Sequence, residues 1–153
     1  VRDDLLGRAR PETPSFMNFA AMAKEGSMLN TPPTFAWYLA GLVFQWLLAQ
    51  GGVPAIERKN IAKAQLLYDC LDASGFYTSP VRKEDRSRMN VPFKLPDAAL
   101  DEAFLKGAKE HGMVQLKGHR AVGGMRASIY NAMPVEGVHA LVAYMQEFER
   151  THG

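Results

Sequence analysis

Residues 30–50 read NTPPTFAWYLAGLVFQWLLAQ. Asn30 and Thr31 are of the type that caps helix N-termini, and proline is favoured in the first helical turn. The stretch therefore predicts a helix from about residue 33 to residue 50, which the glycine pair at 51–52 ends. Apolar side chains occupy nearly every side of this helix, so it must be covered on several sides. It is either a buried core helix or a helix shared between domains or subunits.

The residues before this helix show little regular pattern. Residues 1–33 contain scattered prolines and predict one short helix, around Phe16 to Lys24. A stretch of this kind rarely begins a self-contained domain. We expect residues 1–54 to be the end of a large domain that begins upstream, and residues 55–153 to form a small domain.

The residues after this helix predict a small α+β layer. A helix from about residue 56 to residue 73 carries one apolar stripe, made of Ile61, Ala64, Leu67 or Tyr68, and Leu71. Two more helices are predicted from Asp97 to Gly112 and from Pro134 onward. Three or four short strands are expected, at residues 76–77, 89–95, 114–117 and 127–130. Pro92 places the second of these at a sheet edge or bulge, and residues 82–88 predict a solvated loop or edge.

The composition is that of an ordinary globular chain. Hydrophobic residues make up 47% of the 153 residues, and the formal net charge is only +2. This small excess is weak support for nucleic-acid binding, and we expect no nucleic-acid partner. The apolar run at residues 35–49 is shorter than the roughly 20 residues of a membrane span, so no membrane partner is expected. No signal peptide follows Val1, and the chain is expected to be processed or to be a piece of something longer.

Cysteine and histidine usage excludes several kinds of site. Cys70 is the one cysteine, which excludes an internal disulfide framework and a multi-cysteine zinc site. It is expected to pack on the apolar side of its helix, and it fits a reducing, cytoplasmic compartment. No histidine has a partner at metal-ligand spacing, so no metal site is predicted.

Residues 118–126, GHRAVGGMR, form the segment most suited to ligand chemistry. Glycines leave backbone N–H groups uncovered, and arginine matches carboxylate or phosphate in a bidentate manner. His119, Arg120 and Arg126 are therefore candidates to hold a small ligand with two anionic groups. The alternative is a glycine-rich hairpin whose charges face water. Asn30 and Thr31 present a similar choice between binding a phosphate and simply capping the helix.

Several runs resemble the phosphoserine aminotransferase family. They are Val1–Gly7, Ser27–Leu39, Arg86–Phe93, Lys117–Arg120, Gly123–Pro134 and Glu147–Arg150. The resemblance covers essentially the whole chain. It implies the C-terminal part of a fold-type I (α/β) pyridoxal-phosphate enzyme, with the end of the large domain followed by a small α+β domain of short antiparallel strands and helices.

The resemblance also implies an activity. Members of the family are homodimers with one pyridoxal 5'-phosphate per subunit. They transfer an amino group between L-glutamate and 3-phosphohydroxypyruvate, giving O-phospho-L-serine and 2-oxoglutarate in serine biosynthesis, and in bacteria they often serve pyridoxine synthesis. These small molecules are the expected substrates.

Matched residue by residue, the resemblance assigns roles to five side chains. Asn30 and Thr31 match a pair that reaches across the dimer to the cofactor phosphate of the other subunit. Arg126 matches the arginine that binds the substrate α-carboxylate. His119 and Arg120 match residues that hold the substrate phosphate.

One departure concerns the Schiff-base lysine of the family, which lies upstream of the segment matching Val1. No lysine of this chain lies in that motif, so the chain holds no catalytic residue of this kind. We expect it not to transaminate alone, because transamination needs that lysine. Two alternatives are another fold-type I enzyme without a phosphate pocket, such as a cysteine desulfurase, and a non-catalytic anion-binding module.

Overall fold

A computed structural model describes all 153 residues. The chain divides into two compact units, residues 1–49 and residues 50–153. The assignment of residues 1–54 to the end of a larger domain, and of residues 55–153 to a small domain, stays a prediction.

The first unit holds two 3₁₀ turns, at Asp3–Leu5 and Ser15–Met17, and two α-helices. Helix α1 spans Phe19–Lys24, and Asn18 caps it by accepting hydrogen bonds from two backbone N–H groups of the first turn. Helix α2 spans Thr34–Ala49, which confirms the long helix predicted from the sequence.

Helix α2 has no buried residue. Nine of its large apolar side chains are exposed, around the whole circumference of the helix. Phe35 near its start and Leu48 near its end are each 72% exposed. A helix that is apolar all round is stable in water only when something covers it. Residues 1–49 do not supply that cover, so both expectations, a buried core helix and a helix shared between domains or subunits, stay predictions.

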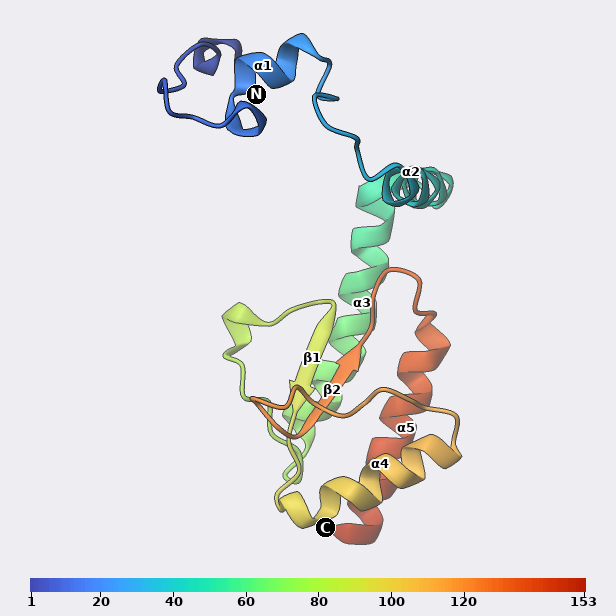
Figure 1. Cartoon of the computed structure of the whole chain (residues 1–153). Helices are drawn as coiled ribbons and strands as arrows, with labels where there is room; N and C mark the ends of the chain where they lie inside the picture. Colours follow the sequence, from blue (N-terminus) through green and yellow to red (C-terminus); the bar gives the residue numbers. More distant parts are fainter. The chain divides into compact units, whose positions relative to one another are not determined.

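The second unit packs three helices against a small sheet (Figure 1). The helices are α3 (Gly52–Ala73), α4 (Asp101–Glu110) and α5 (Val135–His152). Strands β1 (Asn90–Phe93) and β2 (Met125–Ser128) pair in antiparallel register, with Asn90 opposite Ser128 and Phe93 opposite Met125. The α+β class predicted for this region is confirmed.

Two of the predicted strands are reduced to single bridges, Thr78 with Lys94 and Lys117 with Met125. At residues 76–77 the Ser74 hydroxyl accepts the two backbone N–H groups that a strand would have used. At residues 114–117 the backbone of Gln115 is left-handed (φ 63°), which interrupts an extended chain. The predicted strand at 127–130 forms two residues earlier, at 125–128.

The core lies between the three helices and one face of the sheet. Phe104 of α4 is fully buried, and its ring lies 5.1 Å from that of Phe148 and 5.9 Å from that of Phe93. The α3 stripe differs from the prediction, because Ile61 is exposed while Asn60 and Lys63 are buried. These two polar side chains bind the chain beyond β2, as described below. Cys70 packs against the core as expected.

No single helix of the chain is both long enough and apolar enough to cross a membrane.

Candidate functional site

A tight hairpin joins Lys117 to Met125 and carries the glycine-rich segment. The Gly118 N–H donates to the Gly124 carbonyl at 2.8 Å, which closes the hairpin. A Cβ on Gly118 would collide with the carbonyl oxygens of Gly123 and Gly124, so only glycine fits there. The glycines are thus required by the fold of the hairpin itself.

His119 and Arg120 lie in the turn of this hairpin, and both are exposed. The His119 carbonyl accepts from the backbone N–H groups of Val122 and Gly123, both at 2.8 Å. Its ring Nδ1 accepts from the Ala121 N–H at 3.2 Å, so Nε2 is the nitrogen of the neutral ring that carries the proton and can donate. Arg120 has no carboxylate partner.

Arg126 lies on β2, one residue after the bridge that closes the hairpin. Its side chain is on the sheet face opposite the core, because the alternate residues Met125 and Ala127 are buried. Its Nε is buried and has no hydrogen-bond partner. The Nε of Arg86 is likewise buried without a partner, but Arg86 and Arg150 each bind a carboxylate at 2.6 Å through a terminal nitrogen. Arg126 has no such carboxylate partner. Arg126 is a cation whose buried donor lacks an acceptor, and an anion would supply one.

Two polar side chains of α3 hold the segment that follows β2. The Lys63 ammonium donates to the carbonyls of Tyr130 at 2.7 Å, Met133 at 2.9 Å and Ile129 at 3.3 Å. Burial lowers the pKa of Lys63. Asn60 bonds Asn131 through their side-chain amides at 2.7 Å. The strand that carries Arg126 is therefore followed by a segment that buried polar side chains hold in place. This role of Asn60 and Lys63 was not predicted from the sequence.

A polar cluster that was not predicted from the sequence lies on the same sheet face as Arg126. Asn90 of β1 accepts hydrogen bonds from the hydroxyls of Ser128 and Tyr130, at 3.1 Å and 3.3 Å. The alternation of residues 89–95 could have placed Asn90 on the outward face of a strand. Nothing in the sequence alone indicates which strand lies beside it.

Asn30 and Thr31 lie in the other unit, in the irregular segment before α2. Both are exposed, and neither side chain bonds the helix. The first helical bond runs from the Trp37 N–H to the Pro33 carbonyl, so the helix begins too late for either residue to cap it. The capping alternative is therefore wrong. The structure thus gathers His119, Arg120 and Arg126 on one hairpin and leaves Asn30 and Thr31 on a separate unit.

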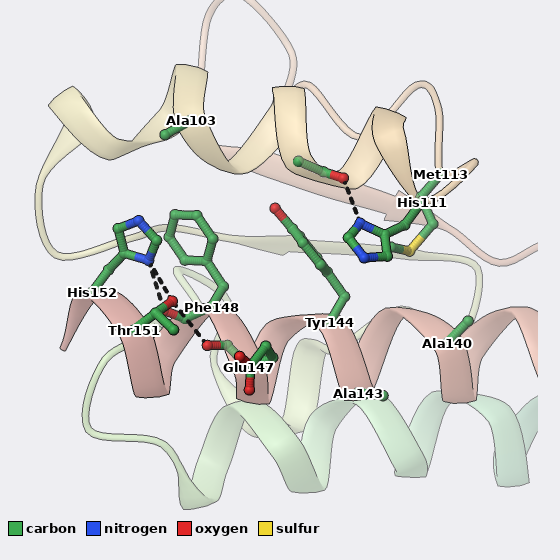
Figure 2. A pocket seen from close by; sticks show the side chains of 11 residues that line it. Ala103, His111, Met113, Ala140, Ala143, Tyr144, Glu147, Phe148, Thr151 and His152 are labelled. Carbon is green, nitrogen blue, oxygen red and sulfur yellow. Dashed lines mark hydrogen bonds between the residues drawn. The ribbon is translucent and has the colours of Figure 1, made fainter.

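A cavity of about 550 Å³ lies between α4 and α5, and none of these residues lines it (Figure 2). Tyr144 and Phe148 line it, with His111 and His152 at its edges. His111 binds the Gly107 carbonyl at 2.8 Å through Nδ1, and His152 stacks on Phe148 with ring centroids 4.0 Å apart. These contacts lie at the C-terminal ends of α4 and α5. They provide no cluster of donors for an anion.

The other reactive groups do not form a site. No three His, Cys, Asp or Glu side chains are grouped so that they could hold a metal ion. Burial, and next the charge of Glu149, raise the pKa of the Cys70 thiol. A thiol whose pKa is raised is a poor nucleophile.

Comparison with known proteins gives consistent matches along the chain. A family model described as "Aminotransferase class-V" matches residues 1–141. A phosphoserine aminotransferase from Aromatoleum aromaticum is 63% identical over 153 residues, which is 100% of this chain and 42% of that protein. One from Pseudomonas aeruginosa is 60% identical with the same coverage.

Solved structures show the same likeness. The phosphoserine aminotransferase from Bacillus circulans subsp. alkalophilus superposes with a TM-score of 0.90 at 42% identity, covering 100% of this chain and 43% of that one. The pyridoxal-phosphate-bound phosphoserine aminotransferase from Trichomonas vaginalis gives a TM-score of 0.81 at 39% identity, covering 90% and 40%. The chain thus spans about two fifths of the length of the proteins that it matches.

Proposed function

The chain belongs to the class-V aminotransferases, and on that premise we propose that it forms the C-terminal part of a phosphoserine aminotransferase. The complete enzyme would transfer an amino group between L-glutamate and 3-phosphohydroxypyruvate, giving O-phospho-L-serine and 2-oxoglutarate. The relatives that carry this name are 60–63% identical to the chain over its full length. We place the enzyme in serine biosynthesis.

The observation that carries the proposal is the unpaired donor of Arg126. A buried guanidinium N–H without an acceptor costs about 1–3 kcal/mol, more for a charged group. A substrate carboxylate would remove this cost by binding the guanidinium in a bidentate manner. Since every substrate of the reaction carries an α-carboxylate, the same arginine would orient each of them in turn.

The hairpin turn supplies the second anion site. Arg120 has no carboxylate partner, and His119 presents its Nε2 on the same turn. A cation and a ring N–H on one rigid turn suit a phosphate, which accepts several hydrogen bonds at once. This site would favour a phosphorylated substrate over an unphosphorylated amino acid.

Asn30 and Thr31 fit a cofactor phosphate by their chemistry. An amide and a hydroxyl are neutral donors, and neither is engaged by α2. They would hold the phosphate of pyridoxal phosphate, which when bound supplies the electron sink for amino transfer. The lysine that carries the cofactor in the family is expected outside these residues, so we expect the chain alone not to transaminate.

We propose a homodimer in the cytoplasm as the working form of the enzyme. Helix α2 exposes nine large apolar side chains on all its sides, more than a stable helix leaves in water. Cover from the remainder of the enzyme and from a second subunit would bury this surface. It would also bring Asn30 and Thr31 to the cofactor of the partner subunit.

The test uses a chimaeric enzyme, in which this chain replaces the matching 153 residues of the Aromatoleum aromaticum relative. Loaded with pyridoxal phosphate and titrated with O-phospho-L-serine, it should lose the pyridoxal absorption band. Arg120→Ala should raise the Kd for O-phospho-L-serine about 10- to 100-fold. Arg58→Ala is the matched control, because Arg58 is exposed in the same unit and it should leave the Kd unchanged.

Two outcomes would count against the proposal. Conversion by unphosphorylated amino acids but not by O-phospho-L-serine would assign the chain to a sister aminotransferase. An unchanged Kd in Arg120→Ala would remove the phosphate site from the hairpin turn.

A further inference from the structure

We propose that Asn90 is a second carboxylate-binding residue, whose Nδ2–H donates to the same substrate carboxylate that Arg126 binds. The inference rests on the proposed function and adds a residue to its substrate site. It follows from the strand register, from the hydrogen bonds that orient the amide, and from the lack of any acid on this face of the sheet.

The register brings the Asn90 and Arg126 side chains to one face. Antiparallel pairs alternate between hydrogen-bonded pairs and closer, non-hydrogen-bonded pairs. The Ile129 N–H donates to the Met89 carbonyl at 2.8 Å, which makes Met89–Ile129 a hydrogen-bonded pair. The next pair along, Asn90 with Ser128, is therefore of the closer kind.

The pair of Pro92 and Arg126 is of the same closer kind, since it lies two positions further on. The Arg126 N–H accordingly turns away from β1 and donates to the Leu116 carbonyl at 2.7 Å. This explains why a proline is tolerated inside β1: a backbone N–H there would point away from β2. Asn90 and Arg126 are thus diagonal neighbours on one face, a relation that spans about 7–8 Å.

Two hydroxyls fix the orientation of the Asn90 amide. Its Oδ1 accepts from Ser128 at 3.1 Å and from Tyr130 at 3.3 Å. Tyr130 is itself held by the bond from Lys63 to its carbonyl, at 2.7 Å. Because both hydroxyls donate to the oxygen, the Nδ2 group remains as the free donor. An amide held in this way is preorganised to donate to a ligand.

The groups on this face suit a carboxylate. Arg126 and the Asn90 Nδ2 are donors only, and Pro92, which lies opposite Arg126 on β1, adds no polar group. The strand positions on this face are Asn90 and Pro92 of β1 and Arg126 and Ser128 of β2, and none of them is acidic. A carboxylate offers about four lone-pair sites, so a bidentate arginine leaves sites for a further donor. The Nδ2 group of Asn90 is that further donor.

The test uses Asn90→Asp in the chimaeric holoenzyme described above. Aspartate keeps an oxygen for the two hydroxyls and replaces the free NH₂ group with a negatively charged oxygen of nearly the same shape. Titration with L-glutamate should show a Kd raised about 10- to 100-fold, because a donor to a charged group is replaced by a repelling charge. Asn90→Ala should show a smaller rise, since it removes the donor without adding the charge.

A ligand without a carboxylate separates binding from a general structural effect. O-phosphoethanolamine carries the phosphate and amino groups of O-phospho-L-serine but no carboxylate. Its Kd should be the same in the unsubstituted chimaera and in Asn90→Asp.

The outcomes separate the proposed function from the role of Asn90 in binding the carboxylate. An unsubstituted chimaera that binds neither L-glutamate nor O-phospho-L-serine would overturn the proposed function and this inference with it. A chimaera that binds both, with an unchanged Kd for L-glutamate in Asn90→Asp, would overturn this inference alone. An equal loss of affinity for O-phosphoethanolamine would also overturn it, because a structural defect would then explain the effect.

Discussion

Replacing Lys63 by methionine tests whether the segment after β2 is held by a buried ammonium. Lys63 is 3% exposed and donates to three backbone carbonyls, two of them within 2.9 Å. Methionine has a similar length and flexibility but no donor. The substitution therefore removes the hydrogen bonds and keeps most of the packing.

The expected cost follows from the acceptors that are left without a partner. An acceptor stranded away from water costs about 1–3 kcal/mol. The bonds to Tyr130 and Met133 are short, while the bond to Ile129 at 3.3 Å is weak. Relief from burying the charge offsets a part of the loss. We expect Lys63→Met to lower the free energy of unfolding by about 2–4 kcal/mol.

The assay is urea unfolding of residues 50–153, followed by circular dichroism. This segment contains every residue of the hydrophobic core and is expected to fold alone. Lys59→Met is the matched control, because Lys59 lies one turn earlier on α3 and bonds only the exposed Gln50 side chain. It should cost less than about 0.5 kcal/mol. Equal losses in the two variants, or no loss in Lys63→Met, would refute the reasoning.

Three further predictions concern the pH dependence, the hairpin and the core. Hydrogen bonds from Arg86, and next from Lys83, lower the pKa of Asp72. The carboxylate therefore stabilises the fold above its ordinary pKa of 3.8, and this stabilisation is lost as the pH falls toward the lowered pKa. The urea midpoints of the wild type and of Asp72→Asn should therefore converge in acid. Gly118→Ala should cost about 1–3 kcal/mol in urea unfolding, because its Cβ meets carbonyl oxygens, while Gly75→Ala, with open space around its Cβ, should be near neutral. Phe104→Ala should cost about 3–5 kcal/mol in the same assay, since the ring is fully buried.

Much of the fold was predictable because helix signals are local. Proline, glycine and apolar periodicity fixed both ends of α2 and the start of α5 to within a residue, and the end of α3 at Ala73 as predicted. Helix α3 begins at Gly52, before the predicted start at about residue 56. The alternation of residues 89–95 likewise revealed β1. Each of these signals lies within the element that it specifies.

The rest depended on contacts between distant residues. A lysine at position 63 has the same local pattern whether it faces water or binds carbonyls near residue 130, so its burial could not be read from the helix. The Ser74 hydroxyl interrupted one predicted strand by accepting its backbone N–H groups, and the left-handed backbone of Gln115 interrupted another. The residue types permit these local features but do not require them. The cluster at Asn90 needed the register of β1 with β2, which joins residues 38 positions apart.

The candidate site was found partly from the residues and partly from the resemblance. Glycine and arginine in residues 118–126 indicated an anion site, and the structure puts His119, Arg120 and Arg126 on one hairpin. The glycine at 118 turned out to serve the close approach of two backbone strands. The roles of these side chains, and of Asn30 and Thr31, stay predictions.

The most direct measurement is a crystal structure of the chimaeric enzyme with O-phospho-L-serine. The account predicts the carboxylate on the Arg126 guanidinium, within hydrogen-bond distance of its Nε, and the phosphate between His119 and Arg120. A ligand bound with its carboxylate elsewhere, while the Arg126 Nε stays unpaired, would contradict the account.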